Sequence, residues 1–246
     1  MDAVIVASRN NLRLGASQIK LMAGGGVSSL YDQLEDVQYF EDELHAAVMA
    51  AEDAGTYVMV HVYVPEAIRR AIRAGVKSIE HGQLIDEPTM KLIAEKGVWL
   101  SMQPFIGEGN NHYTNPVQQA KHELVVQGTD RAYQLAKKYG VKLAWGTDLL
   151  FSPANARNQN LNIEKMTRWF SNFEILKMIT HDNAELLALS GRRNPYPGKL
   201  GVIEEGALAD LIVVDGNALE DIKVLTDPGK NMLLIMKDGK IYKNDL

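Results

Sequence analysis

Apolar runs of strand length alternate with amphipathic helical stretches along most of the chain. The helical stretches place apolar residues on one stripe, and several of them end at a glycine. The predicted strands are Gly15–Met22, Tyr57–His61, Val76–His81, Val98–Met102 and Val141–Trp145. The predicted helices are Glu41–Ala54, Pro65–Ala74, Glu87–Lys96, Val117–Tyr139 and Phe173–Leu189. This alternation predicts βαβ units in an α/β fold, with a parallel sheet whose strand ends all lie on one face.

Four polar residues stand at the far ends of these apolar runs. Lys20 follows GASQI, His61 follows TYVMV, His81 follows VKSIE and Asp148 follows VKLAWGT. Parallel barrels carry their functional side chains at the carboxyl ends of the strands, and neighbouring strands are about 4.8 Å apart. Two imidazoles at matching strand ends can therefore share one ion. Nitrogen and oxygen ligands of this kind predict a site for a divalent metal such as zinc, manganese or iron.

Two of these residues also have ordinary interpretations that the sequence leaves open. Lys20 fits a surface lysine whose alkyl chain covers apolar neighbours. Asp148 fits a turn or helix-capping aspartate. The histidines are harder to explain in this way, because both end consecutive predicted strands.

The character of the chain changes after Gly191. A break at Pro195, Pro197 and Gly198 is followed by short apolar runs at Ala209–Val214, Met232–Lys237 and Lys240–Tyr242. The Asp238-Gly239 pair between the last two runs is typical of a hairpin turn. We therefore expect two parts, residues 1–194 and residues 195–246, the second being a small antiparallel β unit.

Several segments in this order resemble the amidohydrolase superfamily, in its imidazolonepropionase-like and Xaa-Pro-dipeptidase-like branch. The segments are IKLMAGGG, MVHVYVPEAIRRAIRAGVKSIEHG, LAWGTD and GKLGVIEEGALADLIVVDGN. The resemblance implies a partial TIM-like (β/α)₈ barrel made of about the last five βα units. It also implies that residues 195–246 form the C-terminal β segment of a small composite sandwich domain.

The resemblance also implies roles for the strand-end residues. Lys20, carrying a carbamate, would bridge two divalent ions, most simply zinc, and His61 and His81 would bind the second ion. Asp148 would bind the first ion and act as general base and acid for the attacking water. Tyr63 would hydrogen-bond the developing oxyanion, and Arg69 would bind a substrate carboxylate. Alternatively, Tyr63 is a tyrosine at the rim that only packs, and Arg69 is a solvated arginine on an exposed helix face.

One part of the family pattern is missing from this sequence. The family carries a His-x-His pair on its first barrel strand, whereas none of the six histidines here is separated from another by one residue. We expect the chain to be the C-terminal part of a longer enzyme and, alone, a poor catalyst. The open sheet edges of such a part predict either a homo-oligomer or pairing with a missing N-terminal half.

The predicted function is metal-dependent hydrolysis of amide-type C–N bonds, with dipeptides or N-acyl amino acids as substrates. An imidazolonepropionase-like cyclic amidohydrolase and an inactive fragment or binding module are the alternatives, together with a metal-free enzyme that uses Lys20 as a Schiff base. The loop Gln103–Pro116, with His112 and Tyr113, fits a substrate lid.

Charge and cysteine content narrow the range of partners and compartments. A net charge of −5 without a basic run argues against nucleic acid or an anionic membrane surface as partner. The absence of cysteine excludes disulfides, thiolate metal sites and a cysteine nucleophile, and fits a cytoplasmic enzyme. No apolar run reaches the roughly 18 residues of a membrane span.

Overall fold

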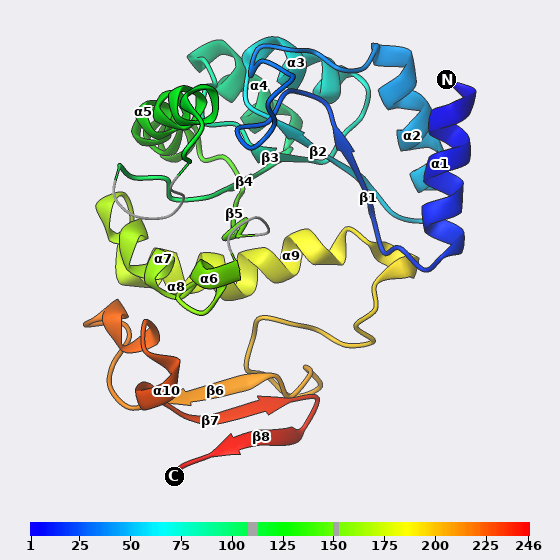
Figure 1. Cartoon of the computed structure of the whole chain (residues 1–246). Helices are drawn as coiled ribbons and strands as arrows, with labels where there is room; N and C mark the ends of the chain where they lie inside the picture. The colour runs from blue at the N-terminus through cyan, green and yellow to red at the C-terminus, as the bar shows by residue number, and fades with distance from the viewer. Residues whose placement is uncertain (108–112, 150–152) are drawn as a thin grey trace. The chain divides into compact units, whose positions relative to one another are not determined.

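The fold is described from a computed structural model of the chain, for residues 1–107, 113–149 and 153–246 (Figure 1). It contains two compact units, each of which is described by itself. The first unit is Met1–Ala144 with Leu187–Pro195, and the second is Trp145–Leu186 with Tyr196–Leu246. Residues 145–186 belong to the same unit as the C-terminal strands, and the domain boundary expected at residue 194 stays a prediction.

A parallel sheet gives the chain its α/β class, as predicted from the strand–helix alternation. Its strand order is β1-β2-β3-β4-β5. The strands are β1 Ile19–Met22, β2 Val58–Val62, β3 Ser78–His81, β4 Trp99–Met102 and β5 Leu143–Trp145. The pairings of β1 with β2, β2 with β3, and β3 with β4 are all parallel. Every predicted strand is present, although each begins one to four residues later than the sequence suggests.

The first unit has one helix before β1, and one helix follows each of the strands β1 to β4. They are α1 Asp2–Arg13, α2 Glu41–Asp53, α3 Pro65–Arg73, α4 Glu87–Lys96 and α5 Pro116–Tyr139. Local chemistry sets their ends. Asp86 caps α4 by accepting a hydrogen bond from the Thr89 amide, and Gly97 and Gly140 end α4 and α5 with φ values of 63° and 62°. Helix α1, which lies beside α2 in Figure 1, was not predicted from the sequence.

The core of the first unit lies between the sheet and the helices that follow its strands. Val60 and Val62 of β2, Ile79 of β3 and Leu100 of β4 are fully buried. On β1 the burial alternates, so that Ile19 and Leu21 are buried while Lys20 and Met22 are exposed. One face of β1 therefore packs against the core and the other is open.

The second unit contains short helices and a three-stranded antiparallel sheet in the order β6-β7-β8. Its strands are β6 Leu211–Val214, β7 Met232–Lys237 and β8 Lys240–Asn244, and its short helices are α6 Pro153–Ala156, α7 Leu161–Lys165 and α10 Pro228–Asn231. The antiparallel tail strands agree with the sequence prediction.

The helix predicted over Phe173–Leu189 is interrupted in the structure. It consists of α8 Asn172–Lys177, a π-helical segment Met178–Asp182 and α9 Asn183–Ala188. Thr180 donates from Oγ1 to the Leu176 carbonyl at 2.7 Å within this stretch. A back-bonding threonine of this kind bends a helix, and π segments are the usual place where a helix accommodates an extra residue.

In the parts of the chain that the structure describes, no helix is both long and apolar enough to cross a membrane.

Candidate active site

Two buried histidines lie together at the carboxyl end of the parallel sheet. His61 is in β2 and His81 ends β3, and their side chains are 7% and 2% exposed. The ring centroids are 4.4 Å apart, with an angle of 70° between the ring planes. The structure thus brings together the two residues that the sequence identified at consecutive strand ends.

An unusual backbone conformation places His81 beside His61. In the sheet register, His81 is opposite Val62, the residue after His61, and successive residues of a strand point to opposite faces of the sheet. Strict alternation would send the His81 side chain in the same direction as that of Val62, away from His61. Instead His81 has a φ of +81°, and its ring lies against that of His61. Backbone conformations of this kind are costly for non-glycine residues and cluster at functional sites.

Hydrogen bonds define which nitrogen of each ring carries the proton. His61 Nε2 lies 3.1 Å from the carbonyl oxygen of Gly25, and His81 Nδ1 lies 2.7 Å from Gln103 Oε1. Carbonyl oxygens only accept, so Nε2 of His61 and Nδ1 of His81 are the donors. The lone pairs are then on Nδ1 of His61 and Nε2 of His81. Among the described residues, neither ring makes another hydrogen bond.

The surroundings favour the neutral form of both imidazoles, because they lower the pKa of each ring. Burial lowers the pKa of His61, an effect opposed by the hydrogen bond with Gly25 and reinforced by the charge of Lys20. Burial also holds the pKa of His81 well below its ordinary value, with the neighbouring His61 and Lys20 acting in the same direction. A neutral imidazole with a fixed tautomer is the form in which histidine binds metals.

Tyr63 completes the group of buried rings. It is 3% exposed, and its ring centroid is 5.2 Å from that of His61 and 5.1 Å from that of His81. Its other side belongs to an apolar cluster with Val27 and Phe105. The contacts fix the ring beside both histidines, as expected for a residue at the same strand ends.

Lys20 lies on the histidine-bearing face of the sheet. Lys20 pairs with Met59 and Met22 pairs with His61 in the sheet register. Lys20 therefore faces the same side of the sheet as His61 and lies two residues closer to the start of the strands. Its side chain is exposed, and its charge contributes to the lowered pKa of both histidines. Lys20 is thus within electrostatic reach of the pair.

Arg69 does not join this group. It lies on α3, where Nη1 donates to Thr89 Oγ1 at 2.8 Å and to Asp86 Oδ2 at 3.3 Å, and Nη2 donates to Glu66 at 3.4 Å. Its charge is compensated within the helix layer. The predicted role in binding a substrate carboxylate finds no support in these contacts.

Asp148 belongs to the second unit. It follows β5 by three residues, is exposed, and has a φ of +48°. The left-handed conformation is tolerated by aspartate and is typical of a tight turn. Its catalytic role therefore stays a prediction.

Part of the predicted lid, including His112, lies outside the described residues. Tyr113 is described, and its hydroxyl is 3.0 Å from Ser28 Oγ in the loop after β1.

The chain is similar to known proteins over nearly its whole length. The model of the amidohydrolase family matches residues 2–242. The chain belongs to the amidohydrolase family. Ochratoxinase of Aspergillus niger is 34% identical over 247 aligned positions, which cover 99% of this chain and 50% of that protein. The chain thus spans about half the length of the curated relatives it matches.

Solved structures of other amidohydrolases are similar over nearly the whole chain. A prolidase in complex with N-methylphosphonate-L-proline is 38% identical, with a TM-score of 0.88 over 98% of this chain and 58% of that one. A Xaa-Pro dipeptidase with methionine bound in its active site is 32% identical, with a TM-score of 0.85 over 98% of this chain and 58% of that one. The resemblance identified from the sequence is thereby confirmed at the level of the family.

The donor set of this amidohydrolase chain fits part of a metal site. His61 and His81 each keep one ring nitrogen for a ligand and anchor the other to a carbonyl oxygen, which is the usual arrangement around metal-binding histidines. Within residues 1–107, 113–149 and 153–246, however, no three His, Cys, Asp or Glu side chains form a group that could hold an ion. The histidine pair would need further ligands.

Sequence reasoning missed the residues that support the histidines. Gln103 comes one position after the predicted strand Val98–Met102, where its amide looks like the start of a loop. Gly25 lies in the run Ala23–Gly26, whose glycines indicate close approach of the backbone to another group but do not say to which one.

Proposed function

We propose that this chain contributes to metal-dependent hydrolysis of an amide-type C–N bond in a dipeptide-like substrate, with Xaa-Pro dipeptides as the first class to test. The observation that carries the proposal is the buried pair of His61 and His81 with its two defined tautomers. The likeness to a prolidase and a Xaa-Pro dipeptidase supports the choice of substrate. The parallel five-stranded sheet supports a partial (β/α)₈ barrel as the framework.

Nδ1 of His61 and Nε2 of His81 would hold a divalent ion, for which zinc is the simplest candidate. When bound, such an ion acidifies a water molecule and polarises the substrate carbonyl. Lys20 would contribute a further oxygen ligand as a carbamate, formed when its neutral amine adds to carbon dioxide and loses a proton. The exposure of Lys20 leaves its amine accessible for this step.

The remaining residues would act on the substrate and its protons. Asp148 would accept a proton from the attacking water and deliver it to the amine nitrogen as the C–N bond breaks. The Tyr63 hydroxyl would donate a hydrogen bond to the carbonyl oxygen as negative charge develops there. The rings of Tyr63, His61 and His81 would exclude bulk water from that side of the reacting carbon, because all three are buried.

The test is hydrolysis of a panel of Xaa-Pro dipeptides by the full chain with added zinc or manganese. Asp148→Asn and His81→Asn are the matched variants. The expected result is slow, metal-dependent hydrolysis that both variants abolish, together with metal uptake that His81→Asn weakens. Metal uptake unaffected by His81→Asn, or hydrolysis equal in all three proteins, would show that the site is not the one proposed.

A further inference from the structure

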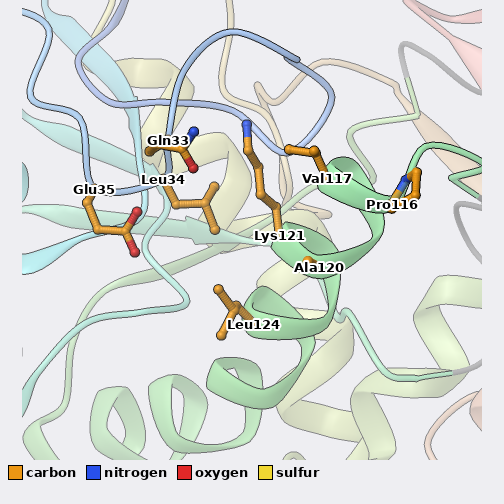
Figure 2. Close-up of a pocket in the computed structure, with 8 residues that line it drawn as sticks. All are labelled: Gln33, Leu34, Glu35, Pro116, Val117, Ala120, Lys121 and Leu124. Atoms are coloured by element: carbon orange, nitrogen blue, oxygen red, sulfur yellow. The ribbon is translucent and has the colours of Figure 1, made fainter.

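A buried lysine on α5 binds the loop that follows β1. Lys121 is 5% exposed, and its Nζ donates to the carbonyl oxygens of Gly26 at 3.0 Å and Ser29 at 2.9 Å. It also donates to the carbonyl of Asp32 and lies 3.3 Å from the carboxylate of the same residue. Figure 2 shows the side chain rising from α5 toward this loop, near Gln33. A buried ammonium is costly unless it is fully hydrogen-bonded, so these contacts hold the loop firmly in place.

Asp32 connects the lysine to the glycine run. Its Oδ2 accepts hydrogen bonds from the Gly26 amide at 3.1 Å and from Gln38 Nε2 at 3.3 Å. Lys121 and Asp32 thus hold Gly26 from both sides, one through its carbonyl and the other through its amide. The two residues form what we call the Lys121–Asp32 clasp.

The residue before Gly26 is the one that touches the histidine pair. The Gly25 carbonyl accepts the Nε2 proton of His61 at 3.1 Å. A Cβ on Gly25 would be 1.8 Å from the Gln33 carbonyl oxygen, so only glycine allows the loop to fold back this closely. The position of the Gly25 carbonyl therefore depends on the whole loop. Lys121 of α5 makes four polar contacts with that loop, and Gln118 of the same helix donates to the Ser28 carbonyl.

We propose that Lys121 and Asp32 are positioning residues, which fix the Gly25 carbonyl against His61 and so determine that Nδ1 of His61 is the nitrogen available to a ligand. The effect on metal binding rests on the function proposed above. The effect on the tautomer does not, because it concerns the metal-free chain.

A cavity of about 400 Å³ beside the clasp is a separate feature. Leu34, Val117 and Leu124 line it together with the stem of Lys121, whereas neither histidine does (Figure 2). The apolar residues of its lining can accommodate an apolar side chain in place of Lys121, while the Asp32 carboxylate loses its cationic partner. Lys121→Met is therefore the informative variant, since it keeps most of the stem and removes the ammonium.

The experiment is nitrogen-15 NMR of the histidine rings in the full, metal-free chain at a pH where His61 is neutral. The variants are Lys121→Met, Lys121→Arg and Asp32→Asn. Lys137→Met, an exposed lysine on the same helix, is the control for the loss of one positive charge. The two-bond proton–nitrogen pattern assigns the tautomer of each ring directly.

In the wild-type chain and in Lys137→Met, we expect His61 to carry its proton on Nε2. Lys121→Met should give a mixture of tautomers, Asp32→Asn a smaller shift in the same direction, and Lys121→Arg a pattern close to wild type. The tautomer of His81, which is held by Gln103, should not change in any variant. Zinc affinity, measured by competition with a chelator, should fall by about 10–100-fold in Lys121→Met, as for other residues that orient metal-binding histidines.

A folded Lys121→Met with the wild-type His61 pattern would overturn the proposal. If Lys121→Met does not fold, Asp32→Asn is the test, because it keeps the shape of the side chain and removes its charge. A wild-type His61 pattern in Asp32→Asn would then overturn the proposal. If the tautomer shifts in Lys121→Met but the wild-type chain binds no zinc, the positioning role of the clasp is supported and the proposed metal site is wrong.

Discussion

Replacement of Gln103 by leucine removes the hydrogen-bond acceptor of His81 and so measures what that hydrogen bond contributes to stability. Gln103 is 4% exposed and accepts the Nδ1 proton of His81 at 2.7 Å. Leucine has a similar volume but no acceptor, so the variant leaves a buried N–H without a partner. A buried donor left in this way costs about 1–3 kcal/mol. Gln83 also approaches the Gln103 amide at 3.5 Å, but it keeps the Gln103 main-chain carbonyl as an acceptor at the same distance, so the expected loss comes mainly from His81.

The assay is urea denaturation of the full chain at pH 7.5, where His81 is neutral in the folded and the unfolded chain. We expect Gln103→Leu to lower the free energy of unfolding by about 2 kcal/mol. Gln134→Leu, on the exposed side of α5, should stay within about 0.5 kcal/mol of wild type. Gln103→Glu restores an acceptor, and its carboxylate should raise the pKa of His81, as measured by ring NMR. A Gln103→Leu protein as stable as Gln134→Leu would refute the reasoning that the His81 proton is bound there.

Three further predictions concern pH, the loop and the tyrosine. Burial lowers the pKa of His61 and His81, so below about pH 6.5 the unfolded chain binds more protons than the folded chain. As the pH is lowered from there, the free energy of unfolding should decrease by up to about 1.4 kcal/mol per pH unit for each histidine. His81→Asn should make this decrease less steep. Gly25→Ala should destabilise the chain by about 1–3 kcal/mol or more in urea denaturation, because its Cβ would meet the Gln33 carbonyl, whereas Gly97→Ala, with open space around it but a φ of 63°, reports the cost of the backbone alone. Tyr63→Phe keeps the ring contacts and should lower kcat by about 100–1000-fold with little change in KM wherever dipeptide hydrolysis is measurable; an unchanged kcat would limit Tyr63 to packing.

The sequence predicted the framework well because local signals determine it. Helix Glu87–Lys96 was predicted with the bounds that the structure has, since it begins after the capping Asp86 and ends at Gly97. Strand-end histidines were identified because the carboxyl ends of parallel strands meet. The helix at Asp2–Arg13 was not predicted. It lacks the end signals that mark α4, because no side chain caps its N-terminus and Leu14, not a glycine, follows its last residue.

The inner details of the site depend on contacts between distant parts of the chain. Nothing in the sequence around His81 says that its φ is positive, although the following Gly82 indicates a sharp turn. The Gly25 carbonyl that anchors His61 is 36 residues away along the chain, and Lys121 is 89 residues from Asp32. Such pairings become visible only when the fold places the segments side by side, which is why the four strand-end residues could be named but their supports could not.

The measurement that tests the central claim most directly is an anomalous diffraction map, recorded at the zinc edge, of crystals of the chain grown with zinc. The account predicts a peak about 2.0–2.1 Å from both Nδ1 of His61 and Nε2 of His81. Zinc bound only elsewhere, for example at the exposed His45 or the half-buried His181, with no peak between the paired rings, would contradict it.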